Sequence, residues 1–133
     1  MEMEGDTYAR PEDRPTTLWN AVSPGFFDVL GLGVRSGRSL EAGDVRGAPR
    51  VAVVSESWVR QYSPDAQPLG RTFRLLRADS TAWITVVGVV ADAKLGGGQR
   101  ARDDRVYLPL DQVDAGYFIK LLLFIRVFYV LIE

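Results

Sequence analysis

The side chains best suited to catalysis are scarce in this chain, because its 133 residues include no cysteine and no histidine. Without cysteine there is no disulfide, thiolate metal site or cysteine nucleophile. Without histidine the chain lacks the usual general base, the commonest zinc ligand and the central member of a Ser-His-Asp triad. Most hydrolase functions are therefore disfavoured. We predict no enzymatic activity and no catalytic, cofactor-binding or metal-binding residues.

Ser55 stands where a short apolar strand would meet a helix, which is the position of the serine in a nucleophile elbow. The glycines of the G-x-S-x-G motif are absent around it. A serine at this position is also a favourable helix N-cap, because its side-chain oxygen accepts a hydrogen bond from the first turn. We therefore interpret Ser55 as a helix cap.

Carboxylates and arginines leave one catalytic or binding alternative open. Asp92 and Glu56, together with Arg71 or Arg105, could bind an anionic substrate in a small cytosolic α+β enzyme or ligand-binding domain. That alternative requires the carboxylates to share a cleft and to have perturbed pKa values. Asp92 has no histidine partner and ends an apolar strand, so we interpret it as a turn-forming residue.

The loop Ala93 to Arg105 is rich in glycine and arginine and superficially resembles a phosphate-binding loop. It contains neither the Walker spacing nor a G-x-G-x-x-G that opens a helix. Asp103 and Asp104, with Asp92, could be considered for a divalent cation, but no EF-hand spacing supports such a site. The loop is interpreted as a surface loop that could touch a partner.

Length and composition favour one ordinary globular domain. At 133 residues the chain can bury a real core without metals or disulfides. A hydrophobic fraction of 47% with 25% charged residues is typical of such domains. The net charge of -1 argues against nucleic-acid binding. Met1 to Thr7 is acidic and lacks the basic start and apolar run of a signal peptide.

The apolar pattern predicts an α+β fold with a mixed, mainly antiparallel β-sheet and two short helices. The central strand is Trp83 to Asp92, which is rich in β-branched residues and in which Gly88 marks a bulge or a close backbone approach. The helices are expected at about Pro24 to Leu30, capped by Ser23, and at Glu56 to Tyr62. Phe26 and Phe27 are expected in the core. Further strands are expected at Thr16–Val22, Gly33–Leu40, Val51–Val54, Arg71–Arg77 and Val106–Leu110, with Arg71–Arg77 joined to the central strand by a hairpin loop at Ala78–Thr81.

Both ends of the chain differ in character from its centre. Residues 1–15 are polar, with Pro11 and Pro15 around charged residues, and we predict a flexible lead-in. Residues 16–117 are expected to form the domain. Residues 118–133 form an apolar tail interrupted by Lys120 and Arg126; we predict a strand, with a truncated membrane helix as the alternative.

An ordered set of short motifs resembles the periplasmic core domain of MacB-like and FtsX-like ABC transporter permeases. The resemblance covers about Leu18 to Gln112, and the joint order of the motifs is more specific than any one of them. The outer, strand-rich lobe of that periplasmic domain is the part most similar. The motifs are Val22-Ser23-Pro24-Gly25-Phe26-Phe27, Leu30-Gly31, Gly37-Arg38 with Asp44, Val51-Ala52-Val53-Val54-Ser55-Glu56, Pro64, Pro68-Leu69-Gly70, Val86-Val87-Gly88-Val89-Val90-Ala91-Asp92 and Val106-Tyr107-Leu108-Pro109-Leu110.

This resemblance implies a non-catalytic module on the extracytoplasmic face of the bacterial inner membrane, forming one part of a larger membrane protein. It would bind a partner protein or a substrate and transmit conformational change driven by ATP. The implied partners are an ABC ATPase domain and a periplasmic adaptor or lipoprotein. Family members act as dimers, whereas this chain alone is expected to be a monomer. At the tail, Phe124-Ile125-Arg126-Val127 resembles the strand that follows in the family, and Phe128 to Glu133 departs from the pattern.

Overall fold

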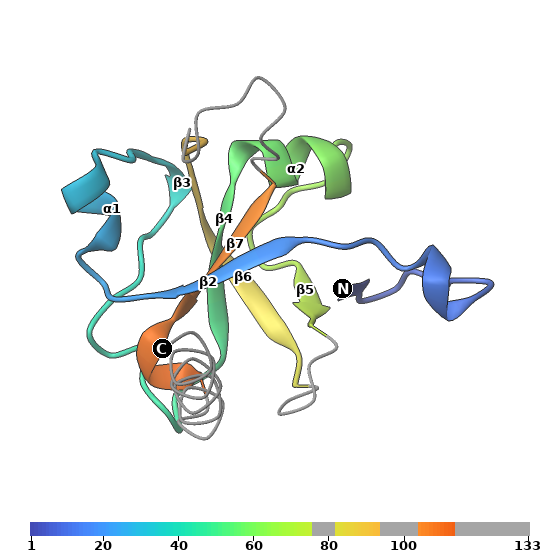
Figure 1. Cartoon of the computed structure of the whole chain (residues 1–133), viewed down its shortest axis with the longest axis horizontal. Helices are drawn as coiled ribbons and strands as arrows, with labels where there is room; N and C mark the ends of the chain where they lie inside the picture. The colour runs from blue at the N-terminus through green and yellow to red at the C-terminus, as the bar shows by residue number, and fades with distance from the viewer. Residues whose placement is uncertain (76–81, 94–103, 114–133) are drawn as a thin grey trace, which may run out of the picture.

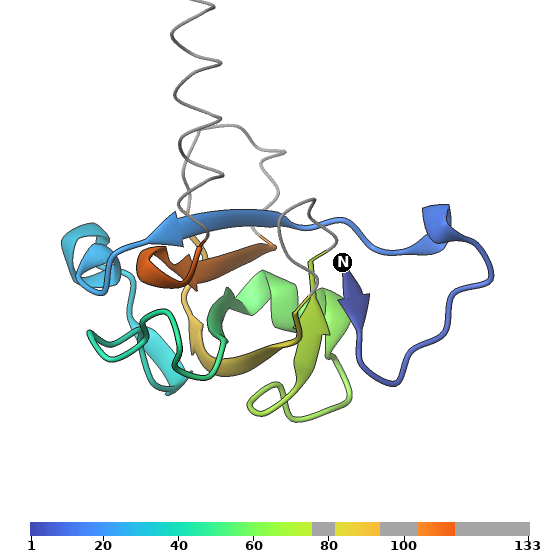
Figure 2. The ribbon, with the colours of Figure 1, turned by 90° about the horizontal axis from the view of Figure 1, so that it is seen from below.

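The computed structural model describes residues 1–75, 82–93 and 104–113, which form one mixed sheet with two short α-helices (Figure 1). The sheet curls into half a barrel, and helix α2 lies on its concave side (Figure 2). The strands are β1 Glu2–Met3, β2 Leu18–Val22, β3 Val34–Gly37, β4 Val51–Ser55, β5 Thr72–Arg74, β6 Ile84–Val90 and β7 Arg105–Pro109; the helices are α1 Phe26–Leu30 and α2 Glu56–Tyr62, with 3-10 turns η1 Pro11–Asp13 and η2 Leu110–Gln112.

The strand order is β1-β5-β6-β4-β7-β2, with β3 added beside β6. Strand β6 pairs parallel with β4 and antiparallel with both β5 and β3. Strand β7 pairs antiparallel with β4 and parallel with β2, while β1 pairs antiparallel with β5. Antiparallel pairings are therefore the majority in the described sheet, and the predicted α+β class with a mixed, mainly antiparallel sheet is confirmed.

Strand β4 explains why an unbroken apolar run appears in the middle of the sequence. Its five residues are all buried. Val51 and Val53 pack into a core cluster on one face, with Phe27 and Tyr107, whereas Ala52 and Val54 pack into a second cluster. Because alternate side chains of a strand point to opposite faces, a strand covered on both faces needs apolar residues at every position.

The centre of β6 is crowded by another part of the backbone at Gly88. A Cβ atom on Gly88 would lie 1.9 Å from the carbonyl oxygen of Arg38. The Arg38 amide in turn donates a 3.0 Å hydrogen bond to the Val87 carbonyl. The pairing of β6 with β4 also shifts register between Ala52 and Val53. Both predicted features of Gly88, a bulge and a close backbone approach, are confirmed.

The two helices occur where the sequence predicts them, but α1 is shorter. It begins at Phe26 rather than Pro24, and its N-terminus has no side-chain cap. The predicted cap at Ser23 is therefore wrong, because Ser23 instead forms a tight turn in which its carbonyl accepts from the Phe26 amide at 3.1 Å. Helix α2 has the predicted bounds, and the Ser55 hydroxyl accepts from the Trp58 amide at 3.3 Å, as a cap should.

The strand predictions hold with adjusted bounds: most strands are shorter than predicted, β4 extends by one residue to Ser55, and β7 is shifted by one residue. Strand β2 starts at Leu18, and β3 covers only the middle of the predicted strand at 33–40. Strands β5 and β6 form the predicted antiparallel pair, while the predicted loop at 78–81 lies outside the described residues. The last predicted strand ends at Pro109, and Leu110 starts η2.

The ends of the chain call for separate comment. The sequence predicts a flexible lead-in at 1–15, yet Glu2 and Met3 form β1, and both Met1 and Met3 are buried in the core. The connection from β1 swings out through η1 and returns to β2 (Figures 1 and 2). The predicted tail at 118–133 lies outside the described residues, so the proposed division of the chain into three parts stays a prediction.

Candidate functional site

The most concentrated polar cluster lies where the end of β6 meets the start of α2. Asp92 accepts a 2.8 Å hydrogen bond from the Ser57 amide through one carboxylate oxygen. Its other oxygen accepts from the Ser57 hydroxyl at 2.5 Å and from the Arg60 guanidinium at 2.9 Å. The carboxylate thus satisfies an amide of the first helical turn and ties α2 to β6.

Partial burial raises the pKa of Asp92, but the hydrogen bonds from Ser57 and the Arg60 guanidinium outweigh it and hold that pKa below its usual value. A carboxyl group that works as a general acid or base near neutral pH needs the opposite shift. Asp92 is therefore suited to hold a helix in place, and it joins two elements rather than ending a simple turn.

Two residues of the anionic-site alternative, Glu56 and Arg71, lie at opposite ends of α2. Glu56 lies 3.3 Å from the Arg35 guanidinium on β3, at the start of the helix. Arg71 donates a 3.0 Å hydrogen bond to the Tyr62 carbonyl at the other end of the helix. An acid at the N-terminus and a base at the C-terminus both match the helix dipole. These positions stabilise α2 and form no common anion site.

Arg105, the fourth member of that alternative, lies on β7 and donates to the Asn20 side chain of β2 at 3.2 Å. Its backbone amide donates to the Ser55 hydroxyl at 2.9 Å. Ser55 is fully buried, so the interpretation as a cap is confirmed, and the same hydroxyl also links α2 to β7.

The aspartates considered for a cation are also apart. Asp104 is 3% exposed, and its carboxylate accepts a 3.0 Å hydrogen bond from the Tyr62 hydroxyl, while Asp92 serves α2. Asp103 and the glycines at 96–98 lie outside the described residues. Within 1–75, 82–93 and 104–113, no three potential ligands gather around a metal position.

An ion pair between Arg38 and Asp44 closes the loop that follows β3. The two guanidinium nitrogens donate to the two carboxylate oxygens at 2.9 and 3.0 Å, and Asp44 is 7% exposed. Asp44 also accepts from the Glu41 amide at 2.7 Å. The hydrogen bonds from Arg38 hold the pKa of Asp44 below its usual value. Both residues belong to the recognised motif set, but nothing in their spacing identifies them as a pair.

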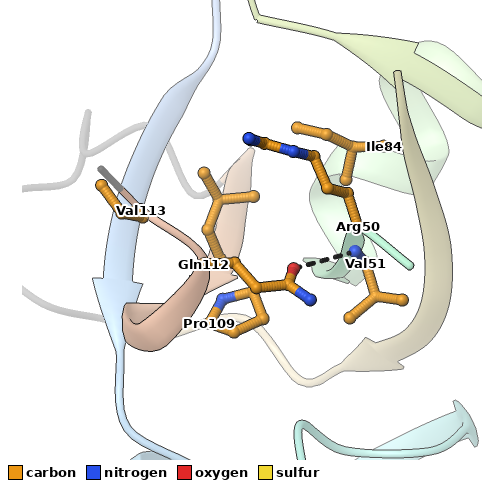
Figure 3. A pocket seen from close by; sticks show the side chains of 7 residues that line it. Arg50, Val51, Ile84, Pro109, Gln112 and Val113 are labelled. Carbon is orange, nitrogen blue, oxygen red and sulfur yellow. Dashed lines mark hydrogen bonds between the residues drawn. The ribbon is translucent and has the colours of Figure 1, made fainter. Parts of the chain in front are cut away.

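Gln112 makes a second joint that the sequence does not reveal. Its side-chain oxygen accepts from the Val51 amide at 3.2 Å (Figure 3), and its side-chain nitrogen donates to the carbonyls of Pro49 and Val45 at 3.0 and 3.3 Å. This arrangement pins η2 to the loop that enters β4. The adjacent cavity of about 10 Å³ has room for about one water molecule, far less than a substrate needs.

The paired aromatics Phe26 and Phe27 serve the core, as predicted. Phe27 is 2% exposed, and its ring meets that of Tyr107 edge to face with centroids 5.0 Å apart. The ring of Phe26 lies 5.7 Å from the same tyrosine. Helix α1 is therefore fastened to β7 by an aromatic cluster.

The comparisons with known proteins agree with this picture. The sequence matches the MacB-like periplasmic core domain family over residues 2–130. It is 26% identical over 98 residues to a macrolide export ATP-binding/permease protein MacB of Mannheimia succiniciproducens. This match covers 74% of the chain and 14% of that protein. It is 36% identical over 72 residues to the corresponding protein of Aggregatibacter actinomycetemcomitans, which covers 54% of this chain and 11% of that one. The chain thus spans only a small part of these curated relatives.

Solved structures show the same fold. The periplasmic region of MacB from Actinobacillus actinomycetemcomitans superimposes with a TM-score of 0.57 at 27% identity, covering 71% of this chain and 38% of that one. The extracellular domain of the noncanonic ABC-type transporter YknZ from Gram-positive bacteria gives a TM-score of 0.52 at 21% identity, covering 69% and 42% of the two chains.

None of the helices in the described residues combines the length and the apolar character that crossing a membrane requires. The family is periplasmic by its description, so the cytosolic compartment of the alternative is wrong. From the match over residues 2–130 and the shared fold, the chain belongs to the MacB-like periplasmic core domain family and is an extracytoplasmic domain of a MacB-like transporter permease.

Proposed function

We propose that this domain is a non-catalytic module that binds a partner protein or a substrate outside the membrane and transmits conformational change driven by ATP. Membership of the MacB-like family is the observation that carries the proposal. Three polar residues point the same way, because the side chains of Ser55, Asp92 and Gln112 each form hydrogen bonds that join two parts of the fold. Rigid joints between elements are what a transmitting module requires.

The pairing of β2 with β7 supports a role under mechanical load. The two strands run parallel over five register pairs, from Leu18 opposite Arg105 to Val22 opposite Pro109. Tension applied at the start of β2 and at the end of β7 pulls the strands in opposite directions along their length. The hydrogen bonds between them are then loaded together, rather than opened one at a time.

The names of the relatives support one of the proposed partners. Two of them are ATP-binding/permease proteins, which supports an ABC ATPase domain as the source of motion. A periplasmic adaptor or lipoprotein is the proposed partner outside the membrane, and a dimer is the proposed state of the whole permease. The relatives are macrolide exporters by name, so a macrolide is the first substrate to titrate. Trp83, 42% exposed, provides a fluorescent reporter for that titration.

The test uses the full-length permease that contains this domain, reconstituted in liposomes. Gln112→Ala removes the joint between η2 and the β4 loop, and Arg35→Ala removes only an exposed ion pair as the matched control. Gln112→Ala should lower transport by about threefold or more at a nearly unchanged rate of ATP hydrolysis, the scale of a coupling defect. Equal transport by both variants contradicts mechanical transmission. ATP or ester hydrolysis by the isolated domain contradicts a non-catalytic module.

A further inference from the structure

Residues 1–6 lie along the outer edge of β5 as a short extended segment. Glu2 pairs with Arg74 and Met3 with Phe73 in antiparallel register. The Glu4 amide adds one hydrogen bond of 3.0 Å to the Thr72 carbonyl. The ladder therefore has only two register pairs, and the chain that follows it is mostly exposed as far as Asp13.

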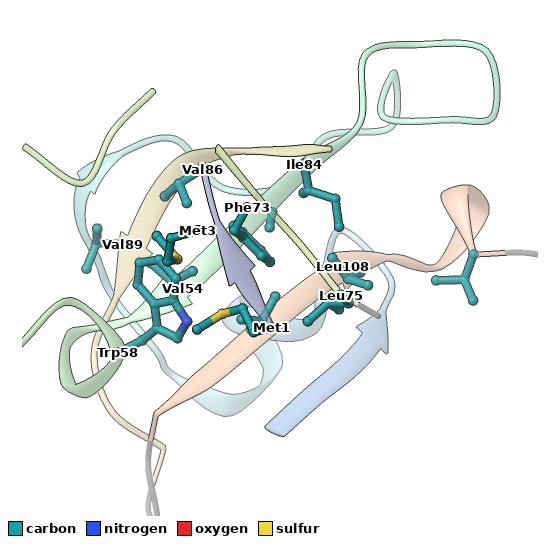
Figure 4. Close-up of a cluster of buried hydrophobic side chains, with 13 residues drawn as sticks. Met1, Met3, Val54, Trp58, Phe73, Leu75, Ile84, Val86, Val89 and Leu108 are labelled. Carbon is teal, nitrogen blue, oxygen red and sulfur yellow. The ribbon is translucent and has the colours of Figure 1, made fainter. Parts of the chain in front are cut away.

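Apolar side chains of this segment enter the core from the sheet edge. Met1 is 9% exposed and Met3 is 2% exposed, although both come from a strand of minimal length. They join the cluster that contains Trp58, Phe73 and Leu75 (Figure 4). If residues 1–6 left, two apolar sites and the unpaired backbone edge of β5 would face water together, which is a template for another strand.

Carboxylates alternate with these methionines and meet a row of donors on and beside β5. Glu2 accepts from the Arg74 guanidinium at 3.0 Å, and the Thr72 hydroxyl donates to the Glu4 carboxylate. Asp6 lies 3.8 Å from the Arg71 guanidinium. The period of two in the sequence Met-Glu-Met-Glu thus fits an edge with apolar sites on one side and basic groups on the other.

We propose that the outer edge of β5, with the Met1 and Met3 sites and the basic groups of Arg74 and Arg71, is a strand-docking groove. Residues 1–6 occupy this groove in cis. The partner that fits it is an extended segment of another protein in which apolar side chains alternate with carboxylates. Backbone hydrogen bonds supply the affinity in such strand addition, and the alternating side chains supply the specificity.

The structure favours exchange of this occupant over a permanent strand. The lead-in is fastened at the β5 edge by two register pairs, whereas β2 is fastened to β7 by five. The connection between β1 and β2 runs outward through the exposed turn η1 (Figure 2), and besides β5 the segment contacts Pro15 and Arg14, at 2.9 Å from Met1 and 3.6 Å from Glu2. A tethered occupant competes at a high effective concentration, so a partner binds strongly only when the cis segment is weakened.

The test weakens the cis segment in the full chain by charge. Glu2→Arg with Glu4→Arg places cations opposite Arg74. The probe is a fluorescent peptide with the sequence of residues 1–8, and the control peptide carries arginine at its second and fourth positions. By anisotropy, the acidic peptide should bind the double variant about tenfold or more tightly than it binds the unaltered chain. The control peptide should bind the variant about tenfold more weakly than the acidic peptide.

Arg74→Glu alone, which repels the cis Glu2 and reverses the charge of the groove, should reverse the preference between the two peptides. A folded double variant that binds neither peptide, or both equally, overturns the proposal. Concentration-dependent dimers that the acidic peptide cannot dissociate assign the groove to a second copy and also overturn it. If the double variant does not fold, excess acidic peptide is added to the unaltered chain, where displacement should speed hydrogen exchange at the Glu4 amide. Unchanged exchange at saturating peptide overturns the proposal.

Discussion

The two edges of the sheet are held in different ways. At one edge, β2 pairs with β7 over five register pairs, yet only Val22 of its side chains is buried. At the other edge, β1 pairs with β5 over two register pairs, yet Met1 and Met3 are both buried. The first edge has the longer backbone ladder, and the second combines a short ladder with two buried side chains.

This difference separates the permanent part of the fold from the exchangeable part. Backbone hydrogen bonds depend little on which side chains a strand carries, so a strand held mainly by them is a fixed part of the fold. A strand held by two apolar side chains and a few ion pairs is read by its sequence, which suits recognition. The β2 edge is therefore the structural edge of the domain, and the β1 edge is the one that can discriminate between partners.

The largest expected effect comes from a change in β6, the strand that lies between the β1 edge and the β2 edge of the sheet. Gly88→Val would place a Cβ atom 1.9 Å from the Arg38 carbonyl oxygen, which only a backbone shift in the central strand can relieve. We expect a loss of more than about 4 kcal/mol in the free energy of unfolding, measured by urea denaturation, with both edges lost together.

The matched control is Gly43→Ala, since a Cβ atom at Gly43 meets no atom within 4 Å. Its effect should be within about 0.5 kcal/mol. A Gly88→Val chain as stable as this control would show that the crossing at Arg38 is not an anchor of the sheet.

The next effect concerns the β2 edge alone. Phe27 follows β2 and packs edge to face on Tyr107 of β7, so Phe27→Ala opens a cavity beside the parallel pair. Removing a buried phenylalanine costs about 3 to 5 kcal/mol in the free energy of unfolding. Val29→Ala in the same helix is the control, because Val29 is 86% exposed. Similar melting temperatures for the two variants would contradict the role of the aromatic cluster.

A smaller effect is expected at the β1 edge, although a buried residue is removed there too. Met3→Ala takes away a 2% exposed side chain, but the edge can detach, which limits the cost to about 2 kcal/mol or less. Hydrogen exchange should show the Glu4 amide losing protection while the amides of β2 keep theirs. Equal loss of protection at both edges would show that β1 and β2 unfold as one unit.

Local patterns reveal the strands and helices of the centre. The apolar run at Val51–Val54 is bounded by turn residues, and Ser55 is both the last residue of β4 and the N-cap of α2. The neighbouring residues are therefore sufficient to predict this strand and this helix. The glycine at position 88 stands out within a β-branched run for a similar reason. Ser23 misleads because the residues that cap a helix also favour a tight turn, and here Ser23 is the first residue of such a turn.

Contacts between distant residues explain what the sequence does not reveal. The alternation from Met1 to Glu4 is visible, but its partner strand is β5, so charge and the nearby prolines suggest an unstructured lead-in instead. Gln112 looks like any polar residue after a strand until the fold brings the β4 loop to it. For the same reason the sequence does not reveal that Glu56, Arg71, Arg105 and Asp92 each bond to a partner outside the candidate set.

The smallest effect expected is a dependence on pH that is confined to the β1 edge. The hydrogen bond from Arg74, aided by Arg14 and the Met1 ammonium group, holds the pKa of Glu2 below its ordinary value of 4.5. A carboxyl with a lowered pKa in the folded state stabilises docking fully above its ordinary value, and that contribution is lost as the pH falls through the lowered value. On acidification, the Glu4 amide should therefore lose protection in that window while the β2 amides keep theirs.

Glu2→Gln should flatten this profile and leave docking weaker at neutral pH, because a neutral amide keeps the shape of the side chain without its charge. Glu12→Gln is the control, since Glu12 is an exposed carboxylate of the same lead-in, 3.7 Å from Arg10. Asp44 and Asp92 also have lowered pKa values, but both are unchanged in the two variants, so the difference between the two profiles reports on Glu2 alone. If Glu2→Gln leaves the pH dependence of protection at the Glu4 amide unchanged, the charge of Glu2 does not stabilise the β1 edge. The buried methionines and the backbone ladder then hold it, and the charge of Glu2 plays no part in what that edge recognises.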